Sequence, residues 1–157
     1  MVTNVTKARA LALLIPAGLL AGAWGSQLIG HLYPCEMCHW QRWPHYAALV
    51  IALLAFVPRS PVRLLVALAA IAIAVSGAIG VAHAGVEYHW WNGFTPCTTT
   101  FSGSGSLIDQ MMKAPIIRCD VAQWKLFGIS LAGFNAIISL SGALAVFYFL
   151  FKRDRAG

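Results

Sequence analysis

The sequence predicts an all-α membrane protein, a bundle of four transmembrane helices without a separate soluble domain. Of its 157 residues, 59% are hydrophobic and only 10% are charged. A helix needs about 20 mostly apolar residues to cross a hydrocarbon core of roughly 30 Å, and the chain has several such stretches. The expected spans are residues 10–29, 43–57, 62–84 and 126–151. We therefore treat 1–157 as a single integral membrane domain.

The first span, residues 10–29, is uncharged throughout. Lys7 and Arg9 precede it, so a cleavable signal peptide over residues 1–26 is an alternative. Its apolar run is longer than the core of a typical signal peptide. Cleavage would also leave three spans, whereas the charges of the loops require both ends of the chain on one side. We therefore expect an uncleaved helix.

The other three spans differ in how clearly their length and composition identify them as transmembrane helices. The apolar part of the second, residues 46–57, reaches spanning length only if the more polar residues 41–45 are included. The third, 62–84, is rich in Ala, Val and Ile and carries no formal charge after Arg63. The fourth, 126–151, is uncharged. These segments leave too few residues for another domain.

The distribution of basic residues predicts the orientation of the bundle. They precede the first span, join the second to the third and follow the fourth: Lys7, Arg9, Arg59, Arg63, Lys152, Arg153 and Arg155. By the positive-inside rule these regions and both termini are cytoplasmic, and the loops 31–45 and 85–125 face outward. Topology thus accounts for the net charge of +6, and we expect no nucleic-acid binding.

All four cysteines fall in the two outward loops, where disulfides can form. Cys35 and Cys38 make a C-x-x-C, and Cys97 and Cys119 follow much later. The spacing leaves four interpretations open: redox-active pairs, structural disulfides, a c-type haem on the C-x-x-C-H that ends at His39, and a zinc site. We favour redox activity and expect no metal ion.

The residues after the C-x-x-C favour a reactive thiol. Arg42 follows Cys38 by four positions, so the two share a face if the segment is helical. A guanidinium and a helix N-terminus both stabilise a thiolate. Pro44 disfavours a continuous helix, so we expect the second helix to begin near Trp43 with 38–42 as an irregular lead-in. The alternative role for Arg42 is an interfacial anchor.

Three segments together resemble a known family. Residues 35–46 read CEMCHWQRWPHY, residues 85–97 read GVEYHWWNGFTPC, and residues 119–130 read CDVAQWKLFGIS. They resemble the first outer loop, the second outer loop and the entry to the fourth helix of the bacterial disulfide bond formation protein B (DsbB) family. The resemblance extends over nearly the whole chain, with the four helices and both loops in order.

This resemblance implies a quinone-coupled thiol oxidase of the bacterial inner membrane, with its cysteine loops in the periplasm. Members reoxidise a soluble thioredoxin-fold dithiol oxidase (DsbA) and pass two electrons to ubiquinone or menaquinone, and thus to the respiratory chain. Which quinone is used, and whether the partner is general or dedicated, stays open. A membrane-anchored c-type cytochrome is the alternative from another class.

The resemblance also implies a role for each sulfur. Cys97 forms the mixed disulfide with the partner, and Cys119 pairs with Cys97. Electrons then pass to Cys35 and Cys38 by exchange, with a Cys35–Cys119 disulfide as a possible intermediate. Cys38 faces the quinone, and Arg42 stabilises the charge that develops there.

The remaining predictions concern histidines and the second loop. His83, near the end of the third span, is a candidate quinone contact or a helix-end histidine bonded to loop carbonyls. His39 and His45 are expected to be solvated at the interface rather than to serve proton uptake. Residues 98–106 are expected to form a flexible polar loop. Residues 107–112 carry an apolar stripe expected to lie on the bilayer or to pack within the loop.

Overall fold

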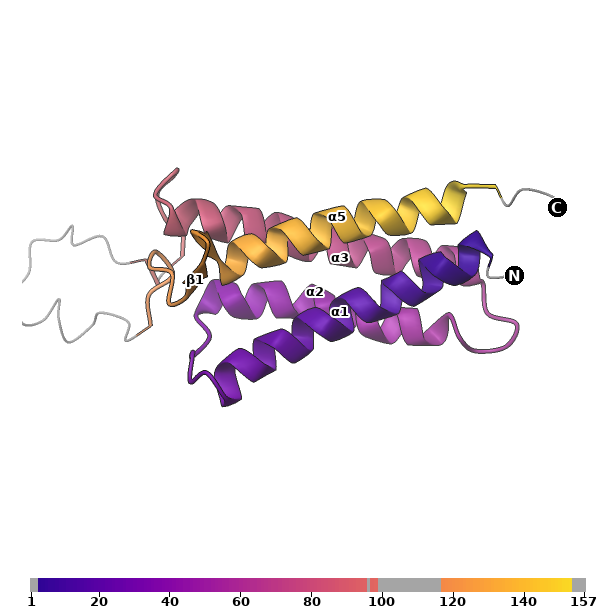
Figure 1. Cartoon of the computed structure of the whole chain (residues 1–157), viewed down its shortest axis with the longest axis horizontal. Helices are drawn as coiled ribbons and strands as arrows, with labels where there is room; N and C mark the ends of the chain where they lie inside the picture. Colours follow the sequence, from indigo (N-terminus) through magenta and orange to yellow (C-terminus); the bar gives the residue numbers. More distant parts are fainter. Residues whose placement is uncertain (1–2, 96, 99–116, 154–157) are drawn as a thin grey trace, which may run out of the picture.

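The computed structural model describes residues 3–95, 97–98 and 117–153. Four long helices and one small sheet form in this part of the chain (Figure 1). The elements are α1 (Asn4–Leu28), α2 (Glu36–Leu54), α3 (Val62–Glu87), β1 (Lys125–Leu126), β2 (Ile129–Ser130) and α5 (Leu131–Phe151). The prediction of four helices is confirmed. Most of the predicted polar loop and the whole apolar stripe at 107–112 lie outside the described residues.

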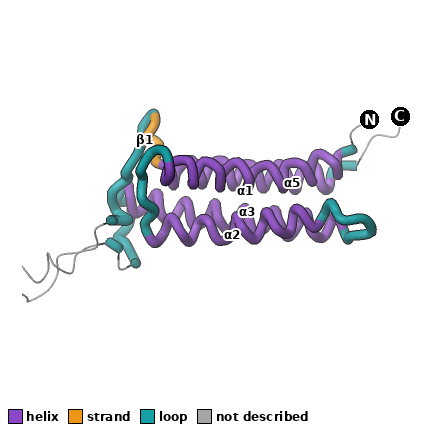
Figure 2. Tube along the Cα trace, turned by 90° about the horizontal axis from the view of Figure 1, so that it is seen from below, coloured by secondary structure: helices purple, strands orange, loops and turns teal. Residues whose placement is uncertain are grey.

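The four helices run lengthwise beside one another, with both termini at one end and the cysteine-bearing segments at the other (Figures 1 and 2). Helices α1, α3 and α5 are each long and apolar enough to cross a membrane. Helix α2 has 19 residues and is about 28 Å long. It packs beside α1 and α3 as the fourth helix of the bundle.

Helix α2 begins at Glu36, well before the expected start near Trp43, so the prediction of an irregular lead-in is wrong. Cys35 caps the helix, and its Sγ accepts a hydrogen bond from the backbone N–H of Cys38 at 3.2 Å. A sulfur thus takes the place of the usual hydroxyl or carboxylate cap. The C-x-x-C lies on the first turn of the helix as a result.

Pro44 lies inside α2 without ending it. A proline removes one helical hydrogen bond and disturbs the carbonyls one turn before it. The carbonyl of Gln41 finds a partner on the neighbouring helix, because Ser76 of α3 donates its hydroxyl to it at 2.7 Å. This hydrogen bond joins α2 to α3 within one turn of the proline.

A short hairpin precedes α5, which begins at Leu131 rather than at the predicted residue 126. Strands β1 and β2 pair antiparallel. Phe127 and Gly128 at the turn have φ angles of 50° and 79°, both in the left-handed region that two-residue hairpins require. Ser130 then caps α5, and its hydroxyl accepts from the N–H of Gly133. The predicted start failed because the hairpin has the same apolar composition as the helix.

Small residues set the distance between α3 and α5. A Cβ on Gly80 would lie 3.0 Å from the backbone nitrogen of Ala136 and 3.1 Å from the carbonyl oxygen of Ala132. Close backbone approach through small residues is the usual basis of helix packing in membranes. It holds the helix that carries His83 against α5.

Candidate functional site

The four cysteines gather at the end of the bundle opposite the termini. Cys35, Cys97 and Cys119 are buried in one cluster with Met37 and Val86. Cys38 packs against this cluster and is half-buried. Three segments that are far apart in the sequence therefore place all four sulfurs together.

Cys97 and Cys119 form a disulfide with a Cα–Cα distance of 5.4 Å. The backbone N–H of Cys119 donates to the carbonyl of Cys97 at 3.1 Å, so the two segments are also joined by their main chains. Next to Cys119, the Arg118 guanidinium donates to both oxygens of Asp120 and lowers the pKa of that carboxyl. The bonded pair is the one implied for the site that meets a partner protein.

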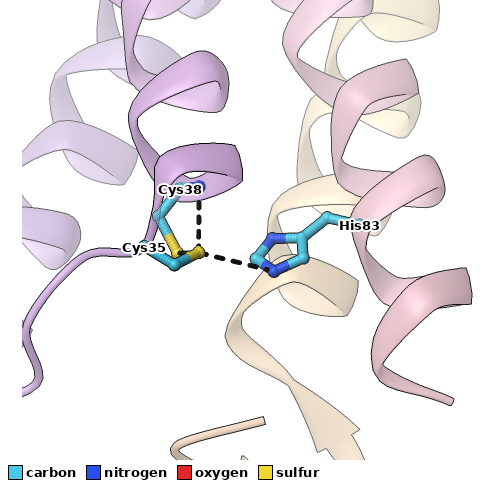
Figure 3. A group of neighbouring side chains, drawn as sticks. All are labelled: Cys35, Cys38 and His83. Atoms are coloured by element: carbon cyan, nitrogen blue, oxygen red, sulfur yellow. Dashed lines mark hydrogen bonds between the residues drawn. The ribbon is translucent and has the colours of Figure 1, made fainter. Parts of the chain in front are cut away.

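Cys35 and Cys38 are free thiols whose Sγ atoms lie 2.8 Å apart (Figure 3). The hydrogen bond with Cys38 and burial raise the pKa of Cys35, while the backbone N–H of Cys38 acts weakly in the opposite direction. The direction of this shift favours a thiolate on Cys38 over one on Cys35. A disulfide needs an S–S distance near 2.05 Å, so only a small movement would close this pair.

His83 of α3 lies beside the thiol pair and is only 2% exposed (Figure 3). Gln41 donates its amide Nε2–H to His83 Nδ1 at 2.8 Å, so the neutral ring carries its hydrogen on Nε2. Nε2 is 3.6 Å from Cys35 Sγ and 3.7 Å from Glu87 Oε1. This histidine can therefore present an N–H to the sulfur of Cys35.

The sulfurs of Cys35 and Cys38 and a ring nitrogen of His83 all lie within 4.8 Å of one another, so the three groups could hold a metal ion. Zinc is the metal that such a ligand set suits. Two sulfurs bound tetrahedrally at 2.3 Å from zinc are about 3.8 Å apart. The observed 2.8 Å between Cys35 and Cys38 is much shorter. The pair thus fits sulfur–sulfur exchange better than metal ligation.

Arg42 is held inside the bundle and is 8% exposed. Its guanidinium donates to Gln27 Oε1 at 2.8 Å and to the carbonyl of Ala23 at 3.1 Å, both on α1. It also lies over the ring of Trp24, 5.5 Å from the centroid. This position favours a role within the site over that of an interfacial anchor, which would extend towards water.

A cavity of about 350 Å³ lies between α1, α2 and α5. Cys38, Arg42 and His45 line its wall on α2, and mostly apolar side chains line the rest. Such a volume with a few polar groups is typical of a small-molecule site. A smaller cavity of about 50 Å³ is lined by both thiols, Arg42, His83 and Glu87. His83 is not among the residues that line the larger cavity, so its predicted contact with a quinone stays a prediction.

A buried polar network extends from His83 into the bundle. Asn135 of α5 donates to Gln41 Oε1 at 2.8 Å, and its own Oδ1 lies 2.9 Å from His45 Nε2. The expectation that His45 is solvated at the interface is wrong, because the ring is 3% exposed. The early start of α2 is the reason, since it places His45 on an inner turn. His39 is exposed.

Sequence reasoning missed Gln41, Glu87 and Asn135 as parts of the site. A signal was present for Asn135, which is an amide in an uncharged and mostly apolar span. Polar side chains in such spans are rare and usually functional. Gln41 and Glu87 lie at span ends, where polar residues are ordinary. Their place in the site can be recognised only once it is known that α2 packs against α3.

Comparison with known proteins agrees with this geometry. The family model described as Disulfide bond formation protein DsbB matches residues 6–149, which include all four cysteines and most of every helix. No curated protein and no solved structure matches the chain. The match favours a thiol-based activity over a c-type cytochrome. The chain therefore belongs to the DsbB family, whose members are disulfide-generating membrane oxidoreductases.

Proposed function

We propose that this protein reoxidises a soluble, DsbA-like thioredoxin-fold dithiol oxidase and passes the two electrons to a membrane quinone. One observation carries the proposal. A bonded and a free cysteine pair pack in one cluster, and Cys38 of the free pair also lines a cavity beside Arg42. In this arrangement electrons can pass from the Cys97–Cys119 disulfide, which would meet the partner protein, to Cys38 at the cavity by thiol–disulfide exchange alone.

The first step takes electrons from the partner protein. A thiolate of the reduced partner attacks Cys97 Sγ and breaks its bond to Cys119, which forms a mixed disulfide. The second thiolate of the partner then releases the partner as a disulfide. Cys97 and Cys119 are left as two thiols that hold the two electrons and two protons. A disulfide such as Cys97–Cys119 is the acceptor that thiol exchange requires.

The second step transfers the electrons within the cluster. With Cys35 and Cys38 joined as a disulfide, the thiolate of Cys119 attacks Cys35, and Cys97 then resolves the Cys35–Cys119 bond. Cys35 and Cys38 become thiols while Cys97 and Cys119 are bonded again. The described arrangement corresponds to this stage. The His83 N–H beside Cys35 suits the charge that develops on that sulfur.

A quinone supplies the final two-electron oxidation, which returns Cys35 and Cys38 to a disulfide. The need for a strong acceptor follows from the partner. DsbA-type oxidases have potentials near −120 mV, and each 30 mV is about 1.4 kcal/mol for two electrons. On the protein side, Arg42 is fixed by Gln27 and the Ala23 carbonyl, so its charge already lies at the cavity wall. Ubiquinone and menaquinone both belong to the required class.

The proposal includes a location in the bacterial inner membrane, with four spanning helices and the cysteine end in the periplasm. Supporting this, the two termini and the α2–α3 loop, whose sequences carry the basic residues, lie at the other end of the bundle. That end is then cytoplasmic by the positive-inside rule. The quinol would be reoxidised by the respiratory chain.

The test uses purified protein, reduced DsbA-like partner and ubiquinone, with quinone reduction followed by absorbance. Wild type should turn over, and Cys38→Ser should not, because the pair can no longer form a disulfide. In cells, Cys97→Ala should leave the partner reduced. Wild type without the partner gives the background rate. Turnover by Cys38→Ser at the wild-type rate, or an oxidised partner with Cys97→Ala, would contradict the proposal.

A further inference from the structure

We propose that His45 supplies a second polar contact for the quinone in the larger cavity and favours its reduced form. Nδ1 of His45 accepts a hydrogen bond from the hydroxyl that the ring oxygen remote from Arg42 gains on reduction. This inference rests on the proposed function, since it takes the cavity to be the quinone site. It assigns a substrate contact to a residue other than the four cysteines that exchange disulfides (the cysteine relay).

The position of His45 on α2 makes the contact possible. Cys38, Arg42 and His45 are spaced four and then three residues apart, so they form one stripe on the helix. All three line the larger cavity. His45 lies about 4.5 Å further along the helix axis than Arg42, deeper in the bundle. A ring with polar atoms at its two ends can therefore meet Arg42 at one end and His45 at the other.

The buried network determines which nitrogen of His45 is free. Asn135 Nδ2 donates to Gln41 Oε1 at 2.8 Å, so Asn135 Oδ1 is an acceptor. The hydroxyl of Ser139 donates to this Oδ1 at 2.9 Å, and His45 Nε2 donates to it at 2.9 Å. The neutral imidazole therefore carries its hydrogen on Nε2. Nδ1 is left as a buried acceptor without a partner in the described part of the chain.

A buried acceptor of this kind distinguishes the two states of the substrate. The quinone carries two carbonyl oxygens, which are acceptors, whereas the quinol carries two hydroxyls, which donate. The balanced reaction joins Cys35 and Cys38 as a disulfide and transfers their two electrons and two protons to the quinone. His45 Nδ1 gains its missing partner only when the product forms. The contact thus favours electron transfer from the thiols to the ring.

The inference is tested by binding rather than by turnover. The probes are durohydroquinone, with two hydroxyls, and 2,3,5,6-tetramethylphenol, with one, added anaerobically to protein whose cysteines are kept reduced. Tryptophan fluorescence reports binding, because Trp24 lies against Arg42. Wild type should bind durohydroquinone about five- to tenfold more tightly than the phenol, the usual value of one hydrogen bond. His45→Phe, which keeps a ring but no nitrogen, should lose most of this preference.

A matched control is His39→Phe on the same helix, where the histidine is exposed. It should keep the wild-type preference. Equal affinity of wild type for the two probes overturns the inference without any variant, so the test stands even if His45→Phe does not fold. An unchanged preference in a folded His45→Phe also overturns it. If wild type binds neither probe, nor duroquinone, the proposed quinone site itself fails.

Discussion

At the scale of single residues, the site depends on where each buried polar side chain finds its partner. Arg42 illustrates this, because both of its hydrogen bonds go to α1 and neither goes to a sulfur. Its guanidinium is therefore held ready at the cavity wall before any substrate arrives. The side chain of Gln27 makes no other hydrogen bond in the described residues, so holding Arg42 is the role we assign to it.

Gln27→Leu should therefore weaken quinone use without affecting exchange with the partner protein. A hydrogen bond to a charged group contributes about 1.5–3 kcal/mol, so a rise of at least about tenfold in the KM for quinone is expected. Steady-state kinetics at varied quinone and fixed partner concentration measure the effect. The control is Gln123→Leu, because Gln123 donates to the Tyr33 carbonyl away from the larger cavity. A normal KM in Gln27→Leu would show that Arg42 does not need this partner.

At the scale of elements, the helices themselves were predictable, but their first turns were not. Apolar runs of sufficient length predicted α1, α3 and α5, because membrane helices follow composition closely. The start of α2 was missed because a cysteine serves as the cap and because the helix continues through Pro44, where Ser76 of α3 bonds the Gln41 carbonyl. Neither feature can be read from the local sequence. The hairpin before α5 was missed for a similar reason, since its turn places Phe127 in a conformation that bulky residues rarely adopt.

Helix α1 provides a direct test of the larger cavity. A Cβ on Gly22 or on Gly25 would meet no atom within 4 Å, so packing does not explain either glycine. Of these two glycines, Gly22 lines the cavity and Gly25 does not. Gly22→Leu should therefore fill part of this space and raise the KM for quinone at least tenfold. Gly25→Leu should not, although both changes replace glycine by a better helix former and favour α1 by about 1 kcal/mol.

The two leucine variants are compared by quinone titration and by thermal unfolding. Both should fold at least as well as wild type, because the new side chains meet open space. Both should also exchange normally with the partner, since α1 contributes nothing to the cysteine cluster. An equal effect of the two variants on quinone use would mean that the cavity is not the site.

At the scale of the whole molecule, the function was easier to predict than the geometry that supports it. The four cysteines and Arg42 were identified from spacing and from resemblance, and the structure brings the cysteines into one cluster with Arg42 nearby. The buried network of Gln41, His83 and Asn135 was not identified. Such a network depends on which faces of α2, α3 and α5 meet, and α3 and α5 are so apolar that they give little periodic signal for their faces.

The orientation of the bundle leads to a prediction for the whole chain. Both ends of the chain and the α2–α3 loop lie at one end of the bundle, and the cysteine segments lie at the other (Figures 1 and 2). If the basic end is cytoplasmic, single cysteines placed at the two ends should differ in their access to reagents. The background has all four native cysteines replaced by alanine. Ser60→Cys then marks the α2–α3 loop, and Asn92→Cys marks the segment after α3.

In intact spheroplasts, a membrane-impermeant maleimide should label Asn92→Cys and leave Ser60→Cys unlabelled. Lysis should make Ser60→Cys reactive, which controls for a buried or unfolded thiol. The reason is physical: the reagent cannot cross the bilayer, and positively charged loops are retained on the cytoplasmic side. Labelling of Ser60→Cys before lysis would reverse the orientation and place the cysteine relay in the cytoplasm. A reducing compartment does not sustain disulfides, so the proposed relay would then lose its partner as well.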